Sequence, residues 1–453
     1  MNNINKDILR LAGPSILANI TIPLVGIVDT AIVGHLGDAA AIGGIAIGTM
    51  LFDLLYWNFG FLRIGTSGLT AQAYGMAPQP PKGGVVPAEC RKILAQSMGV
   101  AMLAAMAIWA IQWLFVTVVL AIVPCSAEAA SVAREYFFVR IWAAPATLML
   151  MGLKGWFIGM QDTKSPMAVD ILVNVVNMAA SYGLAVYAAK GVVGVAWGTL
   201  IAQYSGLILA VLILVFGYII DVRFLFSDLK TVLRRAEMRR MMALNGNLFI
   251  RSLCFMVVYV GFTSLAGKYG DTELAVSSIL MKLFMFFSFF VDGFAYAGEA
   301  LVGKAFGRLA VGGERTEVKR IVRALFNWAI GVGMLFTLLY VIWGDESIAL
   351  MTDNKAVLDA STKYIGWLIA MPLISTLAFM WDGVFVGATA GVQIRNSMLW
   401  AALAFVAGYT ATYRFVGPQA LYIGYFAHLV ARAVYLTVEW PVLLKRTENT
   451  DCK

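Results

Sequence analysis

The sequence predicts an all-α polytopic membrane protein, with twelve transmembrane helices in two pseudo-symmetric six-helix bundles around a central cleft. Of its 453 residues, 60% are hydrophobic and only 13% are charged, and the mean hydropathy is +0.80. Soluble domains are about 45–50% apolar and about 25% charged, so this composition excludes a soluble enzyme and a disordered chain. Four scattered cysteines without a CxxC pair predict neither a disulfide framework nor a metal site.

Long apolar runs carry the prediction of helices. About 20 mostly apolar residues cross the ~30 Å hydrocarbon core, and in lipid such runs satisfy their backbone groups as helices. The predicted spans are residues 8–34, 46–74, 93–123, 135–160, 166–189, 192–220, 239–267, 274–303, 321–343, 361–388, 396–416 and 418–444. The first run lacks a strongly basic leader and a clear cleavage site, so we expect it to be retained rather than removed as a signal peptide.

The distribution of basic residues predicts the orientation. Most of the 34 lysine and arginine residues fall in connections on the side that also holds both termini. Basic loops stay in the cytoplasm, so both termini are predicted to be cytoplasmic. The net charge of +8 therefore follows from membrane topology, and we expect no nucleic-acid partner.

An internal repeat predicts two lobes. The polar connection 221–238 separates an N-terminal lobe, 1–220, from a C-terminal lobe, 239–453. The paired residues are Gly13 with Gly246, Gly60 with Gly293 and Gly65 with Gly298 at an offset of 233, and Gly155, Phe157 and Gly159 with Gly383, Phe385 and Gly387 at an offset of 228. Six spans per copy let each copy enter the membrane from the same side, which favours alternating access by rocking of the lobes.

Asp29 is the prominent embedded acid of the first half. A charge at the bilayer centre costs about 2.5–3.5 kcal/mol on insertion scales, so its presence calls for a reason. Asn174, Asn177 and Ser181 share one face of the fifth span, and Thr199 lies on the sixth. An acid that faces neutral amides in a low-dielectric pocket is expected to bind protons near neutrality. The alternative is a carboxylate that caps or packs near a helix end.

Two prolines predict a bend in the first span. Pro14 and Pro23 each remove a backbone hydrogen bond and clash one turn earlier, which predicts a kinked helix. A bend coupled to the charge state of Asp29 is a natural two-state element. A static kink is the alternative.

Embedded charges of both signs mark the second half. The candidate residues are Arg251, Lys282, Asp292, Glu299 and Asp382. Because unpaired buried charges are costly, we predict an ion-pair network there, with a second proton or substrate site as the alternative. Arg432 is expected to reach the bilayer surface or to pair locally.

Several stretches together resemble one known family. They are PLVGIVDTAIVGHLG (23–37), NFGFLRIGTSGLTAQAYG (58–75), GWFIGMQDTKSPM (155–167), NGNLFIRSLC (245–254), DGFAYAGEALVGKAFG (292–307) and WDGVFVGATAGVQIRNSM (381–398). Over nearly its whole length, the chain resembles the MATE (multidrug and toxic compound extrusion) transporters, in particular their DinF-like branch. The resemblance implies twelve helices in two lobes, and efflux of amphipathic, often cationic compounds driven by inward proton or sodium flow. It also implies a bacterial cytoplasmic (inner) membrane location and a monomer.

The resemblance assigns roles to residues of the first lobe. Asp29 matches the acid of the family's first helix, whose protonation is linked to bending at the proline matched by Pro14. Asn177 and Thr199 match its polar companions. Ser181 departs from the pattern, because members with a well-formed cation site carry an acid there.

The second lobe also departs from other MATE branches. The acid of their seventh helix is absent from FIRSLC, whereas Asp382 matches an acid on the tenth helix of this branch. Fewer acids favour protons over sodium as the coupling ion. We therefore predict a secondary active multidrug efflux transporter that antiports amphipathic or cationic compounds against inward H⁺, with no cofactor and no enzymatic activity.

Other classes fit less well. A lipid-linked (polyprenyl or oligosaccharide) flippase of the same superfamily would need a strongly cationic cleft, and a Na⁺-coupled antiporter would need more acids. An intramembrane prenyltransferase would need clustered acids such as DxxxD to hold Mg²⁺. No predicted span offers that cluster.

Overall fold

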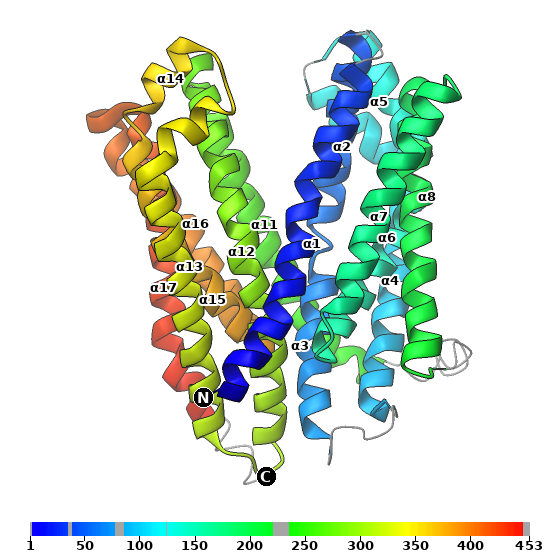
Figure 1. Ribbon diagram of the computed structural model, residues 1–453, viewed down its shortest axis with the longest axis vertical. Helices are drawn as coiled ribbons and strands as arrows, with labels where there is room; N and C mark the ends of the chain where they lie inside the picture. The colour runs from blue at the N-terminus through cyan, green and yellow to red at the C-terminus, as the bar shows by residue number, and fades with distance from the viewer. Residues whose placement is uncertain (1, 35–38, 78–85, 124, 221–234, 447–453) are drawn as a thin grey trace. The chain divides into compact units, whose positions relative to one another are not determined.

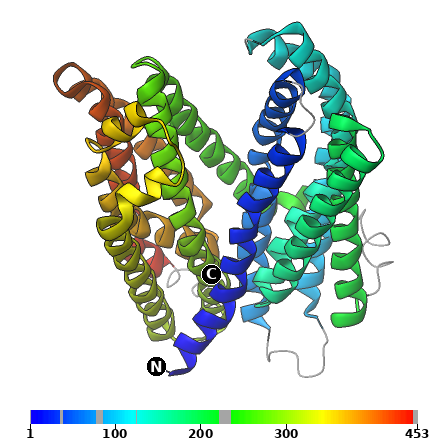
Figure 2. The ribbon, with the colours of Figure 1, turned by 45° about the horizontal axis from the view of Figure 1, so that its top comes forward.

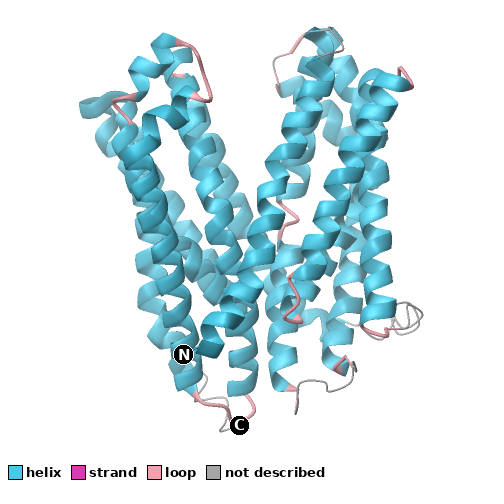
Figure 3. Ribbon diagram, in the orientation of Figure 1, coloured by secondary structure: helices cyan, strands magenta, loops and turns pink. Residues whose placement is uncertain are grey.

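The long apolar runs fold into helices, as the sequence predicts. The computed structural model describes residues 2–34, 39–77, 86–123, 125–220 and 235–446, and within these ranges it contains helices and no strand (Figure 3). Ten helical segments of this described part are long and apolar enough to cross a membrane. The all-α membrane class is therefore confirmed, while the count of twelve spans stays a prediction.

The described residues of the first half form eight α-helices. They are α1 (Asn2–Gly34), α2 (Ala39–Trp57), α3 (Phe61–Met76), α4 (Ala88–Ile122), α5 (Ala127–Arg140), α6 (Ala144–Gly159), α7 (Lys164–Tyr182) and α8 (Gly191–Leu212). The short 3₁₀ turn η1 (Ile141–Ala143) joins α5 to α6. The π-helical turns η2 (Gly183–Tyr187) and η3 (Ile213–Gly217) end α7 and α8.

The second half repeats this pattern with longer helices. They are α11 (Arg235–Gly267), α12 (Asp271–Leu309), α13 (Arg315–Ala349), α14 (Lys355–Ser361), α15 (Ile365–Gly387), α16 (Gly391–Val416), the 3₁₀ turn η4 (Gly417–Gln419) and α17 (Ala420–Arg446). Each predicted span overlaps one or two of the observed helices.

One predicted span is broken. Residues 46–74 form α2 and α3, which are separated by a turn at residues 58–60. The Phe59 amide donates to the Tyr56 carbonyl at 2.9 Å, a three-residue step that tightens the helix end. The Asn58 side chain donates to the Leu54 carbonyl at 2.9 Å, and Gly60 follows. Local side-chain bonding of this kind competes with a continuing helix.

The chain divides into two compact units. The N-terminal unit is Leu17–Met242, and the C-terminal unit is Ala243–Lys453 together with Met1–Ile16. Helix α1 therefore contributes its first turns to one unit and the remainder to the other. The predicted division into 1–220, 221–238 and 239–453 stays a prediction, because residues 221–234 of the connection lie outside the described part of the chain.

Each unit contains the same pairs of neighbouring helices (Figures 1 and 2). In the N-terminal unit α6 packs against α3 and α4, and α7 packs along α8. In the C-terminal unit α15 packs against α12 and α13, and α16 packs along α17. The two halves therefore share one internal arrangement, in agreement with the repeat found in the sequence.

The repeated glycines lie where these helices meet most closely. A Cβ atom on Gly155 of α6 would come within 2.2 Å of the Arg63 carbonyl oxygen of α3. A Cβ atom on Gly383 of α15 would come within 2.5 Å of the Ala295 carbonyl oxygen of α12. Small residues let membrane helices pack backbone to backbone, so the glycine repeat encodes the same contact twice.

The turns that follow α6 and α15 are equivalent as well. Gln161 and Thr389, which are 228 positions apart, both adopt positive φ angles, of 67° and 53°. The amides of the residues that follow donate back to Phe157 and Phe385, in both cases at 2.9 Å. This is the hydrogen bond of a Schellman motif, which ends both helices in the same way.

Candidate functional site

A buried polar cluster lies in the N-terminal unit, where α7 faces α8. Asn177 is 3% exposed, and its side-chain amide donates to the Thr199 hydroxyl of α8 at 3.0 Å. Thr199 is 7% exposed and donates in turn to the Val195 carbonyl at 3.2 Å. Ser181 is fully buried one turn after Asn177 and donates to the same carbonyl at 3.5 Å. These three predicted residues are therefore brought together.

The same face of α7 also reaches α1. The side-chain amide of Asn174 donates to the Thr21 hydroxyl at 2.7 Å, and Thr21 donates to the Ala18 carbonyl at 2.7 Å. Helices α1 and α7 run in the same direction (Figure 1). Residue 29 follows Thr21 by eight residues, and Ser181 follows Asn174 by seven. At 1.5 Å rise per residue, the backbone of residue 29 therefore lies at about the same height along the helices as Ser181, to within about one turn.

Asp29 belongs to the backbone of α1, but its side chain lies outside the described residues. The coupling role predicted for it therefore stays a prediction. The described polar residues of α7 and α8 near that level, Asn177, Ser181 and Thr199, carry neutral hydrogen-bonding groups. Among the described residues, the Asn177 side-chain carbonyl is buried without a hydrogen-bond partner. A buried, unpaired acceptor calls for an explanation, and a protonated carboxyl group or a cation would satisfy it.

The α7–α8 contact leaves little room beside Ser181. A Cβ atom on Gly198 of α8 would lie 2.5 Å from the Ser181 amide nitrogen and 2.6 Å from its Cα. The two helices therefore touch backbone to backbone at this level. Ser181 fits the small space that the contact leaves.

The predicted hinge residues lie in a single helix. Pro14 and Pro23 are both within α1, which runs from Asn2 to Gly34 as one helical segment. The boundary between the two units falls between Ile16 and Leu17, close to Pro14. Whether α1 bends during function stays a prediction.

The C-terminal unit contains a buried charge triad of Arg251, Asp382 and Arg432, on α11, α15 and α17. One Asp382 carboxylate oxygen accepts from the Arg251 guanidinium at 2.6 Å. The other accepts from Arg432 Nε at 3.2 Å, and Arg432 Nη2 contacts the carboxylate as well. Asp382 is 8% exposed and Arg432 is 2% exposed. Two guanidinium groups thus share one carboxylate, which neutralises only one of them.

Arg432 corrects an expectation. It neither reaches the bilayer surface nor pairs locally, because its partner lies 50 residues away on another helix. The guanidinium also sits 5.5 Å from the centre of the Phe379 ring, which adds a cation–π contact. Arg251 and Asp382, two members of the predicted charged network, form an ion pair. Arg432 was missed as their third member.

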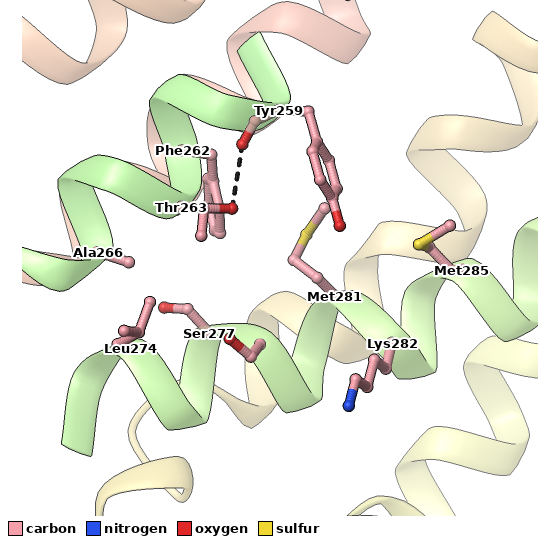
Figure 4. A pocket seen from close by; sticks show the side chains of 10 residues that line it. Tyr259, Phe262, Thr263, Ala266, Leu274, Ser277, Met281, Lys282 and Met285 are labelled. Atoms are coloured by element: carbon pink, nitrogen blue, oxygen red, sulfur yellow. Dashed lines mark hydrogen bonds between the residues drawn. The ribbon is translucent and has the colours of Figure 1, made fainter. Parts of the chain in front are cut away.

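Lys282 is not part of this triad. It borders a small pocket of about 150 Å³ between α11 and α12, together with Thr263, Ser277 and Met281 (Figure 4). It forms no ion pair with a described residue. Asp292 and Glu299 lie further along α12, half-buried and buried. Of the five residues of the predicted network, Arg251 and Asp382 pair with each other and with Arg432, and Lys282 lies apart at the pocket.

Two units that repeat one helix arrangement, each with embedded polar or charged groups, define a polytopic membrane transporter of the internal-repeat type. Comparison with known proteins gives the family. The MatE family matches residues 14–183 and 248–413. The chain is also 31% identical to the DNA damage-inducible protein F of Escherichia coli strain K12, over 96% of this chain and 92% of that protein.

The chain therefore belongs to the MatE family, whose members are transporters and not enzymes. Solved structures agree on the fold. A MATE structure in the bent conformation has a TM-score of 0.86 at 15% identity, covering 99% of this chain and 97% of that one. A MATE structure in the straight conformation has a TM-score of 0.83 at 17% identity, covering 98% and 97%.

Proposed function

We propose that this protein is a secondary active antiporter that exports amphipathic, mostly cationic compounds in exchange for inward H⁺. Membership of the MatE family supports export of small compounds by a membrane transporter. The bacterial relative supports a cytoplasmic (inner) membrane location. The uneven distribution of basic residues supports cytoplasmic termini. The transporter would work as a monomer and use no cofactor other than the coupling ion.

The buried polar cluster on α7 is the observation that carries this proposal. Asn177 and Thr199 join α7 to α8, and Asn174 joins α7 to α1 through Thr21. The helix that holds Asp29 is therefore tied to a face of neutral amides and hydroxyls. A carboxyl group in such a setting pays a desolvation cost for ionising, so proton binding and release there are coupled to its surroundings.

In the proposed cycle, protonation of Asp29 from outside favours release of the exported compound. Deprotonation towards the cytoplasm favours binding of the next molecule. The conformational change would be a bend of α1 near Pro14. Support for this hinge comes from the boundary between the two units at Ile16–Leu17, which falls two residues after Pro14.

The choice of H⁺ over Na⁺ rests on charge. Ser181 supplies a hydroxyl that already donates to the Val195 carbonyl, and it adds no negative charge to the cluster. A sodium ion taken from water needs several oxygen ligands and usually a carboxylate to offset its dehydration. A single acid among amides suits a proton better.

Transport in proteoliposomes tests the proposal. Export of a cationic dye is measured with a pH gradient alone and with a sodium gradient alone, for the wild type, Asp29→Asn and the control Asp7→Asn. Asp7 is an exposed carboxylate of the same helix. We expect transport driven by the pH gradient to fall at least tenfold in Asp29→Asn and to remain in Asp7→Asn.

Undiminished proton-driven transport by Asp29→Asn would remove this residue from the coupling mechanism. Transport driven only by sodium would show that the coupling ion is Na⁺. Inhibition by lipid pyrophosphates but not by cationic dyes would favour a lipid-linked flippase instead.

A further inference from the structure

A basic groove in the C-terminal unit has no role in the mechanism above. It lies between the first turns of α1 and the first half of α13, and its volume is about 690 Å³. This volume lies within the range of sites that bind small ligands, about 300–1,000 Å³. Ile4 and Asn5 line it from α1, and the remaining lining residues come from α13.

Three basic side chains line one end of the groove. Lys319, Arg320 and Arg323 are all exposed, and none of them has an ion pair or hydrogen bond with a described residue. The nearby acid Glu317 is engaged by Arg308 at 2.7 Å. The lining residues that the structure describes include no acid. The groove therefore presents uncompensated positive charge.

The other end of the groove carries no charged residue and is mostly apolar, although Asn327 also lines it. Ala324, Trp328 and Gly331 follow the basic residues on the same face of α13, at helical spacing. From Arg323 to Gly331 the helix rises about 12 Å. The Trp328 indole N–H donates to the Asn5 side chain at 3.2 Å, which ties the α1 wall to α13. The groove is therefore basic at the start of α13 and mostly apolar further along the same helix.

We propose that this groove binds one anionic phospholipid of the leaflet that meets the start of α13. The phosphate would lie among Lys319, Arg320 and Arg323, and an acyl chain would lie along Ala324, Trp328 and Gly331. Basic pockets between transmembrane helices on the cytoplasmic side suit anionic head groups. With the orientation proposed above, this end of the C-terminal unit faces the cytoplasmic leaflet. The lipid would bridge α1 and α13 within that unit.

Lipid titration of the purified full-length protein in a nonionic detergent tests this site. The probes are dioctanoyl phosphatidylglycerol, dioctanoyl phosphatidylcholine and inorganic phosphate, with affinity measured by thermophoresis. We expect saturable binding of phosphatidylglycerol alone. The triple variant Lys319→Gln/Arg320→Gln/Arg323→Gln should bind it roughly a hundredfold more weakly, since each basic side chain near an anionic lipid contributes roughly fivefold.

The control variant Lys164→Gln/Arg239→Gln/Lys445→Gln removes the same charge from exposed residues that do not line the groove, and it should bind within about twofold of the wild type. Gly331→Leu tests the apolar end without a change of charge. A Cβ atom at Gly331 meets no atom within 4 Å, so the leucine enters the groove without displacing the fold. We expect it to weaken phosphatidylglycerol binding roughly tenfold.

Three results would overturn the proposal. Equal loss in the control variant would mean a diffuse surface charge effect. Inorganic phosphate that binds as tightly as the lipid would mean a free-anion site. Self-association of the wild type that the triple variant abolishes would mean that the groove is a protein contact.

Discussion

Removal of the Asp382 carboxylate should destabilise the C-terminal unit strongly. In Asp382→Asn, Arg251 and Arg432 lose their common counter-ion, and Arg432 is only 2% exposed. Breaking a buried ion pair from one side costs about 3–5 kcal/mol, because the remaining charge stays buried without compensation. We expect a loss in this range.

Arg251→Gln should cost less. Its side chain is 19% exposed, and Asp382 retains Arg432 after the substitution. The loss is then that of a hydrogen bond to a charged group, about 1.5–3 kcal/mol. The double variant Asp382→Asn/Arg432→Gln removes both members of the most buried pair. It should lose less stability than the sum of the two single variants, by more than about 1 kcal/mol.

Thermal unfolding of the purified protein in detergent, at one fixed heating rate, checks this order. A unit of about this size shifts its midpoint by about 2–4 °C per kcal/mol, so Asp382→Asn should unfold about 6–20 °C earlier than the wild type. The wild type, the two single variants, Arg432→Gln and the double variant are compared. A midpoint for Asp382→Asn within about 2 °C of the wild type would refute the buried triad. So would a larger loss in Arg251→Gln than in Asp382→Asn.

Two further predictions concern the helix contacts. Gly383→Ala would place a Cβ atom 2.5 Å from the Ala295 carbonyl oxygen and should lower the free energy of unfolding by about 1–3 kcal/mol. The control Gly366→Ala, in the same helix, meets no atom within 4 Å and should leave stability unchanged or raise it. Unfolding midpoints compare the two variants, and equal effects would refute the close contact. Asn177→Ala removes the 3.0 Å hydrogen bond to Thr199, which should lower the free energy of unfolding by about 0.5–1.5 kcal/mol. We expect it also to lower proton-driven dye export at least tenfold. Full transport by this variant would exclude the cluster from coupling.

The sequence predicted the helices well because a chain that crosses lipid must satisfy its backbone hydrogen bonds internally, which long apolar runs do as helices. Each predicted span overlaps helix, and the glycine pairs at constant offsets correspond to matched contacts, such as Gly155 with Arg63 and Gly383 with Ala295. The break at residues 58–60 was missed. It depends on local bonding by Asn58, which hydrophobicity does not reveal.

The charged site was predicted only in part. Periodicity shows which residues share a helix face, and it grouped Asn174, Asn177 and Ser181. Of these, Asn174 contacts α1, while Asn177 and Ser181 contact α8. It does not show which helices meet, so the link between Asp382 and Arg432 was invisible. The one available signal was an arginine placed well inside an apolar span, a position that calls for a partner.

The two units carry different charges at one equivalent position of the repeat. Lys154 and Asp382 occupy equivalent positions, 228 apart, on α6 and α15. Lys154 pairs with Asp170 of the neighbouring α7, whereas Asp382 reaches Arg251 and Arg432 on two other helices. The backbone contacts were retained while the charge at this position was reversed. Protonation of Asp382 would cost the pairing of two arginines, which disfavours it as a reversible proton carrier. The neutral amides of α7 impose no such cost, and this difference favours proton coupling in the N-terminal unit.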